Sequence, residues 1–217
     1  MSDLALAQTR AWVERAVIGL QLCPFARAPQ VKGRVRYVLS AASDPQALTA
    51  DLALELNRLV AEPPARIETT LLVHPRVLTD FDDYNEFLAS ADEALVVLGL
   101  EGVIQIASFH PDYRFAGSAP GDIANATNRS PFPTLHLLRE ESIERALATF
   151  TEPESIYAAN IRAMERLGSA GWAALQRACR DDARAAHPDV ATRSRRQAAG
   201  GLPTRRLKAR AKAASES

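Results

Sequence analysis

Apolar residues recur at helical spacing in several parts of the chain. Val13, Val17 and Leu20 form a stripe that predicts an amphipathic helix ending before Pro24. Leucines between Leu48 and Leu59 predict a second helix, and a stripe from Phe81 to Leu95 predicts a third with Gly99 as its C-terminal cap. Further stripes predict helices over residues 140–150, 151–168 and 172–186. Capping patterns at residues 79–82 and 151–154 support the starts of two of these helices.

Short segments rich in β-forming residues alternate with these helices. Four of them predict strands, over residues 35–40, 68–73, 103–109 and 134–138. Helical connections between the first three strands require those strands to run in the same direction, with right-handed crossovers. We therefore expect an α/β fold, with α+β as the alternative. It would hold a four-stranded, mostly parallel sheet followed by C-terminal helices.

The last thirty residues differ from the rest of the chain. Beyond residue 187 hardly any apolar residue is larger than alanine, and such a segment cannot bury enough surface to fold alone. Among the 217 residues we expect one α/β domain over 1–187 and a disordered basic tail over 188–217. From residue 177 onward the chain has eleven Arg or Lys residues and four acidic residues, whereas the part before residue 177 has a net negative charge. The tail would contact nucleic acid non-specifically, pack on the acidic body or remain solvated.

The composition excludes several classes of protein. No apolar run approaches the roughly 20 residues that span a bilayer. Residues 1–9 do not form a secretory signal, which predicts a cytoplasmic protein. Only Cys23 and Cys179 are present, too far apart for a Cys-x-x-Cys pair, so the sequence indicates no disulfide framework. Phosphate-binding, dinucleotide-binding and serine-hydrolase motifs are also missing, and no cofactor is indicated.

His-Pro pairs follow two predicted strands, at His74 and His110, where open α/β sheets bind ligands. Proline as strand terminator is the alternative interpretation, and we favour it for His74. At His110 an imidazole is followed closely by the Asp112 carboxylate and the Arg114 guanidinium, between aromatic residues. We predict that His110 is a general acid or base and that Asp112 orients it.

A long loop over residues 112–133 continues from this motif. Its polar residues suit recognition of a carboxylate or phosphate, although Asn and Ser in such loops also bond to their own backbone. The predicted substrate-binding residues are Arg114, Asn128, Arg129, Ser130 and Arg139.

Cys23 and His136 are further candidates. Cys23 follows a predicted helix, so a helix dipole would not lower the pKa of its thiol, and it would act as a catalytic thiol only beside a His or Arg. His136 alternates with leucines on the fourth strand and faces the opposite side of the sheet. His110 and His136 are also the candidate ligands of a zinc or iron site. Metal, thiol and plain acid–base chemistry all remain open.

Several motifs occur together in a fixed order: Leu22-Cys23-Pro24-Phe25-Ala26, Asp80-Phe81-x-Asp83-Tyr84-Asn85, Gly99-Leu100-Glu101-Gly102, Phe109-His110-Pro111-Asp112-Tyr113-x-Phe115, Asn128-Arg129-Ser130-Pro131 and Leu135-His136-Leu137-Leu138-Arg139-Glu140. Through these motifs the chain resembles a bacterial family known as domain of unknown function 1415, over about residues 10 to 175. The resemblance implies no activity, because none is attached to the family.

Two functions follow from the residues. The first is a cytoplasmic enzyme that acts on a small anionic metabolite through His110, Asp112 and the arginines of the loop. The alternative is a non-catalytic binding module whose basic tail contacts nucleic acid or a protein partner. In the first case His110→Ala abolishes activity without unfolding the protein; loss of the melting transition would instead mark His110 as structural.

Overall fold

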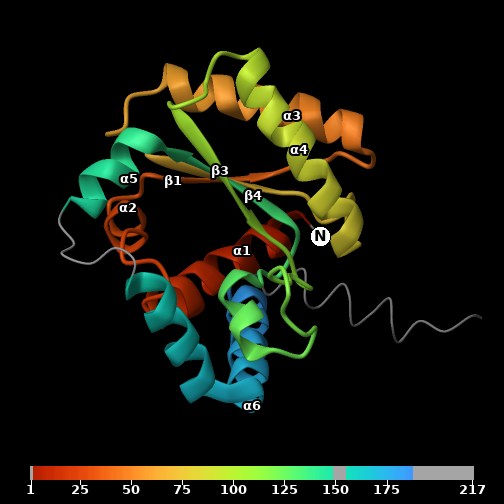
Figure 1. Cartoon of the computed structure of the whole chain (residues 1–217), viewed down its shortest axis with the longest axis vertical. Helices are drawn as coiled ribbons and strands as arrows, with labels where there is room; N and C mark the ends of the chain where they lie inside the picture. The colour runs from red at the N-terminus through yellow and green to blue at the C-terminus, as the bar shows by residue number, and fades with distance from the viewer. Residues whose placement is uncertain (1, 149–154, 188–217) are drawn as a thin grey trace, which may run out of the picture.

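A computed structural model describes residues 2–148 and 155–187 (Figure 1). Four strands form one mixed sheet in the order β1-β2-β4-β3. Their bounds are β1 Val35–Leu39, β2 Thr69–Val73, β3 Ile104–Phe109 and β4 Thr134–Arg139. The α/β class and the four strands predicted from the sequence are confirmed.

Helices surround the sheet in the described part of the chain. Their bounds are α1 Ser2–Trp12, the π-helical η1 Val13–Ile18, α2 Arg27–Val31, α3 Pro45–Ala61, α4 Phe81–Val97, the 3-10 helix η2 Ile123–Asn128, α5 Glu140–Leu147 and α6 Ser155–Ala186. None of these helices is both long and apolar enough to cross a membrane.

The prediction of a mostly parallel sheet is wrong. Only β1 and β2 pair in parallel, because β4 lies between β2 and β3 and runs antiparallel to both. The first three strands still share one direction, as their helical connections predict. The chain between β3 and β4 contains only the short η2 helix, so β4 returns beside β3 in the opposite direction.

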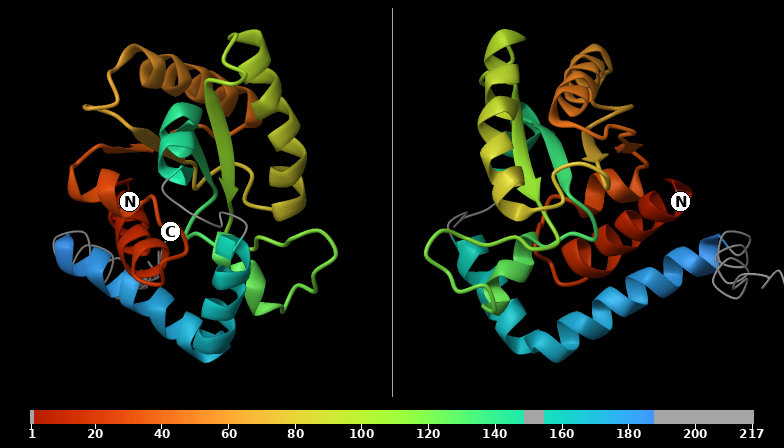
Figure 2. Two further views of the ribbon diagram at one scale, coloured as in Figure 1. Left: turned by 60° about the vertical axis from the view of Figure 1, so that its left-hand side comes forward. Right: turned by 90° about the vertical axis from the view of Figure 1, so that its right-hand side faces the viewer.

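The two faces of the sheet support different layers. Helices α3 and α4 cover one face, while α1, η2 and α6 lie on the other (Figures 1 and 2). Leu72, Leu135 and Leu137 belong to the core beneath α3 and α4. Tyr37 and Leu71 pack into the second core, together with Trp12 from α1. Alternation along the strands therefore decides which chemistry lies on which face.

The predicted helix ends are close to the observed ones, with informative differences. Asp44 caps α3 through the N–H of Ala47. Asp80, rather than Thr79, caps α4 through the N–H groups of Asp82 and Asp83. The two C-terminal helices form the single element α6, bent where Gly168 adopts a φ of 66°. The sequence did not predict α2 or η2. The expected cap at 151–154 and the expected disordered tail at 188–217 lie outside the described residues.

Candidate functional site

The two His-Pro histidines converge on one turn at the end of the sheet. His74 Nδ1 lies 3.1 Å from the carbonyl oxygen of Val77, and His110 Nε2 lies 3.3 Å from that of Leu78. Leu78 adopts a φ of 54°, a conformation that costs a non-glycine residue energy and needs support from its surroundings. The two imidazoles provide that support to successive peptide groups.

His110 is buried and both of its ring nitrogens are bonded to backbone. Its Nδ1 accepts a hydrogen bond from the N–H of Asp112 at 3.0 Å, so its Nε2 carries the proton and donates to Leu78. This pairing fixes a neutral imidazole, and burial lowers the pKa of His110. Asp112 thus contacts His110 through its backbone, and its side chain is exposed. The geometry favours a structural role for His110.

Tyr84 of α4 lies between the two histidine rings. Its ring stacks on His74 at a centroid distance of 5.7 Å and lies 5.1 Å from His110. Its hydroxyl donates to the carbonyl of Thr134 and accepts from the N–H of Phe109, bridging the adjacent ends of β3 and β4. Tyr84 is fully buried. The histidines therefore belong to a packed cluster that closes this end of the sheet.

The predicted substrate-binding residues of the long loop bond to the protein itself. Arg114 pairs with Asp82 at 2.6 Å. Arg129 donates to the carbonyls of Tyr113 and Pro120. The remaining two loop residues act in the same way, since Asn128 donates to the carbonyl of Ser108 and Ser130 to that of Phe132. The bonds of Asn128 and Arg114 tie the loop to β3 and α4, and those of Arg129 and Ser130 stabilise the loop internally.

Arg139 caps the C-terminal end of α3. It occupies the same side of β4 as Leu135 and Leu137, facing α3 and α4. Its guanidinium donates to the carbonyl groups of Leu59, Glu62 and Ile67. A cation bonded to the last carbonyls of a helix also interacts favourably with the helix dipole.

A mostly apolar pocket of about 500 Å³ lies on the opposite face of the sheet. All four strands contribute to its floor, through Val35, Thr69, Leu71, Ala107, Phe109 and His136. Trp12 and Val17 line one side, the segment 23–29 lines another, and Ile143 of α5 lines a third. The volume falls within the range of small-molecule sites.

His136 is oriented in this pocket by a hydrogen-bond chain. Thr69 Oγ1 lies 2.7 Å from the carbonyl oxygen of Leu137 and 2.7 Å from His136 Nε2. Because a carbonyl only accepts, Thr69 gives it its one proton, and His136 Nε2 must then donate to Thr69. Nδ1 therefore carries the lone pair, and it bonds to no residue in the described part of the chain. Burial lowers the pKa of His136 to about 4, which keeps the ring neutral at neutral pH.

Cys23 lies in the segment 23–29, which lines the pocket. Cys23 follows η1, and the short helix α2 begins four residues after it. Burial raises the pKa of the Cys23 thiol, and the nearby N–H groups of Phe25 and Ala26 act in the opposite direction. Cys23 is therefore a thiol, not a thiolate, at neutral pH.

The candidate metal ligands do not come together. His110 packs against Tyr84 and Phe81 of α4, whereas His136 packs against Phe109 on the other face of the sheet. Within residues 2–148 and 155–187, no three His, Cys, Asp or Glu side chains cluster as a metal site requires.

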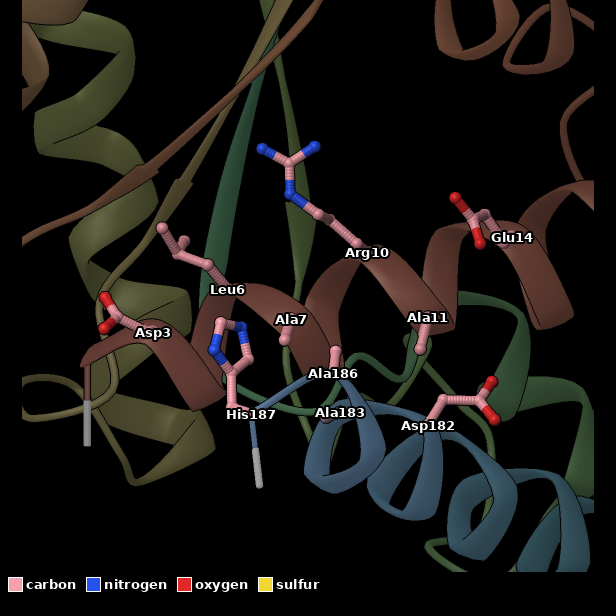
Figure 3. Close-up of a pocket in the computed structure, with 10 residues that line it drawn as sticks. All are labelled: Asp3, Leu6, Ala7, Arg10, Ala11, Glu14, Asp182, Ala183, Ala186 and His187. Atoms are coloured by element: carbon pink, nitrogen blue, oxygen red, sulfur yellow. The ribbon is translucent and has the colours of Figure 1, made fainter. Parts of the chain in front are cut away.

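A second hollow, of about 460 Å³, lies between α1 and α6 (Figure 3). Its floor consists of alanines that let the two helices approach, namely Ala7, Ala11, Ala183 and Ala186. Arg10 points from α1 toward the sheet and lies 4.0 Å from the ring centroid of Tyr37, while Asp182 pairs with Arg15. This hollow is a helix-packing groove with charged rims, and Arg10, Glu14 and Asp182 on it already have partners from the fold.

The fold and the pocket define a mixed α/β protein with an apolar chamber between its sheet and its N-terminal helices. A model of the family described as "Protein of unknown function (DUF1415)" matches residues 4–174, so the chain belongs to this family and the resemblance noted in the sequence is confirmed. No match is found among the curated proteins or among the solved structures.

Proposed function

We propose that the protein is an enzyme that transforms a small, largely apolar molecule in the pocket over the sheet, with His136 as the proton acceptor. The observation that carries this proposal is the hydrogen-bond chain from His136 through Thr69 to the Leu137 carbonyl. A histidine whose second nitrogen is fixed by a partner presents a defined lone pair to a substrate, as general bases do.

The position of the motif residues supports the same pocket. Cys23 to Ala26 of the first motif and His136 of the last line it, although more than 100 residues separate them in sequence. Phe109, from the motif after the third strand, contacts both Trp12 and His136. Residues of the first, fourth and last motifs thus meet around one chamber, and Cys23 is the second group there that could contact a substrate.

The proposal differs from the expectation drawn from the loop. His110 has no free nitrogen, and the arginines at 114, 129 and 139 are bonded to groups of the protein. A loop whose arginines bond to groups of the protein is suited to bracing the sheet. We therefore assign chemistry to His136 and leave His110 a structural role.

His136→Gln tests the proposal. Glutamine retains a donor that can reach Thr69 but has no basic nitrogen, so binding should persist while turnover is lost. The full-length protein would be screened against a small-molecule library by ligand-observed NMR, and each bound compound would then be followed by mass spectrometry for conversion. His187→Gln, at the end of α6, is the matched control.

The outcomes are distinct. Conversion by the wild type and by His187→Gln, but not by His136→Gln, is expected. Conversion at the same rate by His136→Gln would overturn the role of His136. If the wild type binds compounds but converts none of them, the protein is a binding module and not an enzyme.

A further inference from the structure

We infer that the molecule taken by this pocket is uncharged, with a hydroxyl or amide donor that meets His136 Nδ1 and an acceptor oxygen that meets the Ser142 hydroxyl. This inference rests on the proposed function for the location of the site. It departs from the anionic substrate expected from the sequence, and it concerns the charge and polarity of the ligand, whichever reaction follows.

The charges around the pocket disfavour an anion. Glu68 is the acidic residue among those that line the pocket. Its Oε2 lies 3.7 Å from Nη1 of Arg34, which does not line the pocket. Arg139 also borders the pocket, but its guanidinium reaches to the far side of the sheet and bonds to three carbonyls. An anion entering an apolar chamber would therefore lose its hydration without gaining a free cation in the described part of the site.

Two polar side-chain groups that line the pocket have an atom with no hydrogen-bond partner in the described part of the chain. His136 Nδ1 is a hydrogen-bond acceptor, as the Thr69 chain requires. Ser142 Oγ, in the first turn of α5, is buried and has no hydrogen-bond partner among the described residues. A buried hydroxyl without a partner is destabilising, and a ligand oxygen that accepts its proton would remove that cost.

The remaining lining residues determine the polarity of the larger part of the ligand. Leu71 and Ala107 on the floor and Val17, Trp12 and Ile143 on the sides are apolar. Most of the about 500 Å³ is therefore filled favourably only by carbon. A neutral, mainly hydrocarbon molecule with one polar group near His136 and another near Ser142 matches this arrangement.

Cys23 allows this inference to be tested without knowing the ligand. Iodoacetamide and iodoacetate have nearly the same size, and they differ in charge. Alkylation of Cys23 in the Cys179→Ser protein would be followed by mass spectrometry with each reagent, and each rate would be divided by the rate with free glutathione. We expect the normalised rate with iodoacetamide to exceed that with iodoacetate about tenfold, because the pocket excludes the charge.

Glu68→Gln should raise the iodoacetate rate, whereas Glu62→Gln, whose side chain pairs with Arg66 outside the pocket, should not. Equal normalised rates for the two reagents, or faster reaction with iodoacetate, would overturn the inference.

A panel of benzyl alcohol, benzamide, benzoate and benzylamine provides the second measurement, by saturation-transfer NMR. Benzyl alcohol and benzamide are expected to bind, and Ser142→Ala and His136→Phe are expected to weaken them. Preferential binding of benzoate would contradict the inference even if His136 proved to be the base. The absence of any observed reaction would not contradict the inference, because binding and alkylation measure the charge preference independently of turnover.

Discussion

His74 and His110 bond to the carbonyl oxygens of two consecutive residues, at 3.1 and 3.3 Å. They come from the ends of two strands that are not neighbours in the sheet, since β4 lies between β2 and β3. The turn that they share includes Leu78 at a φ of 54°, so the strained backbone is stabilised from both sides. His110, which most suggested catalysis in the sequence, is in this structure part of a brace at the end of the sheet together with His74.

Removal of His110 should therefore destabilise the fold. His110→Ala removes a buried ring and leaves the Asp112 N–H and the Leu78 carbonyl without their partner. A loss of about 2 to 4 kcal/mol in the free energy of unfolding is expected, measured by urea denaturation. His187→Ala is the control and should change stability by less than about 0.5 kcal/mol. An unchanged denaturation midpoint for His110→Ala would restore the catalytic interpretation.

Acid should weaken the fold through two buried histidines. Burial lowers the pKa of both His74 and His136 to about 4, below the ordinary 6.5. The unfolded chain therefore binds more protons between these values. The stabilisation due to the neutral rings is complete above pH 6.5, declines as the pH falls and levels off below pH 4. Each histidine contributes up to about 1.4 kcal/mol per pH unit in that window.

The measurement is the urea midpoint at pH 7, 6 and 5, above the range in which ordinary carboxylates titrate. His74→Gln and His136→Gln should each flatten the dependence on pH, whatever their effect on stability at pH 7. A slope that neither substitution changes would show that other groups cause the acid sensitivity.

The sequence predicted the elements better than their arrangement. Periodicity is a local property, so α3, α4 and the four strands appeared within a few residues of their observed bounds. The position of β4 depends on long-range pairing, which no local pattern encodes. Asp112 and Arg129 showed the same limitation: Asp112 contacts the His110 ring through its backbone N–H, and Arg129 donates to backbone carbonyls, both positions that follow from the fold.

The pocket was the feature most hidden in the sequence. Cys23 and His136 were both candidates, but nothing in their spacing placed them in one chamber. Alternation along β4 correctly separated His136 from Leu135 and Leu137. Thr69, which orients His136, was missed, because a threonine in a strand is an ordinary β-former until its cross-strand neighbour is known.

Arg139 should be a stability residue. Arg139→Met leaves the carbonyls of Leu59, Glu62 and Ile67 without their donor, and a loss of about 2 kcal/mol is expected. Arg145→Met, which breaks an exposed pair with Glu141 one helix turn apart, is the matched control and should cost about 0.5 kcal/mol or less. Alkylation of Cys23 by iodoacetamide should be unaffected by either change at pH 7. Equal destabilisation by the two substitutions would contradict the capping role.

Substitution of two adjacent threonines on β2 can distinguish an effect on the orientation of His136 from an effect on packing. Thr69 faces the pocket and bonds to His136, whereas Thr70 is fully buried on the other face and its hydroxyl has no partner among the described residues. Thr69→Val should cost about 1 to 2 kcal/mol and release His136 from its Nε2–H tautomer, because the ring loses its acceptor. Thr70→Val should be neutral or stabilising, since it removes a buried, unpaired hydroxyl.

Nitrogen-15 shifts of the imidazole report the tautomer, and urea denaturation reports the stability. If Thr69→Val leaves the His136 nitrogen shifts unchanged, Thr69 does not orient the ring and the proposed base loses its support.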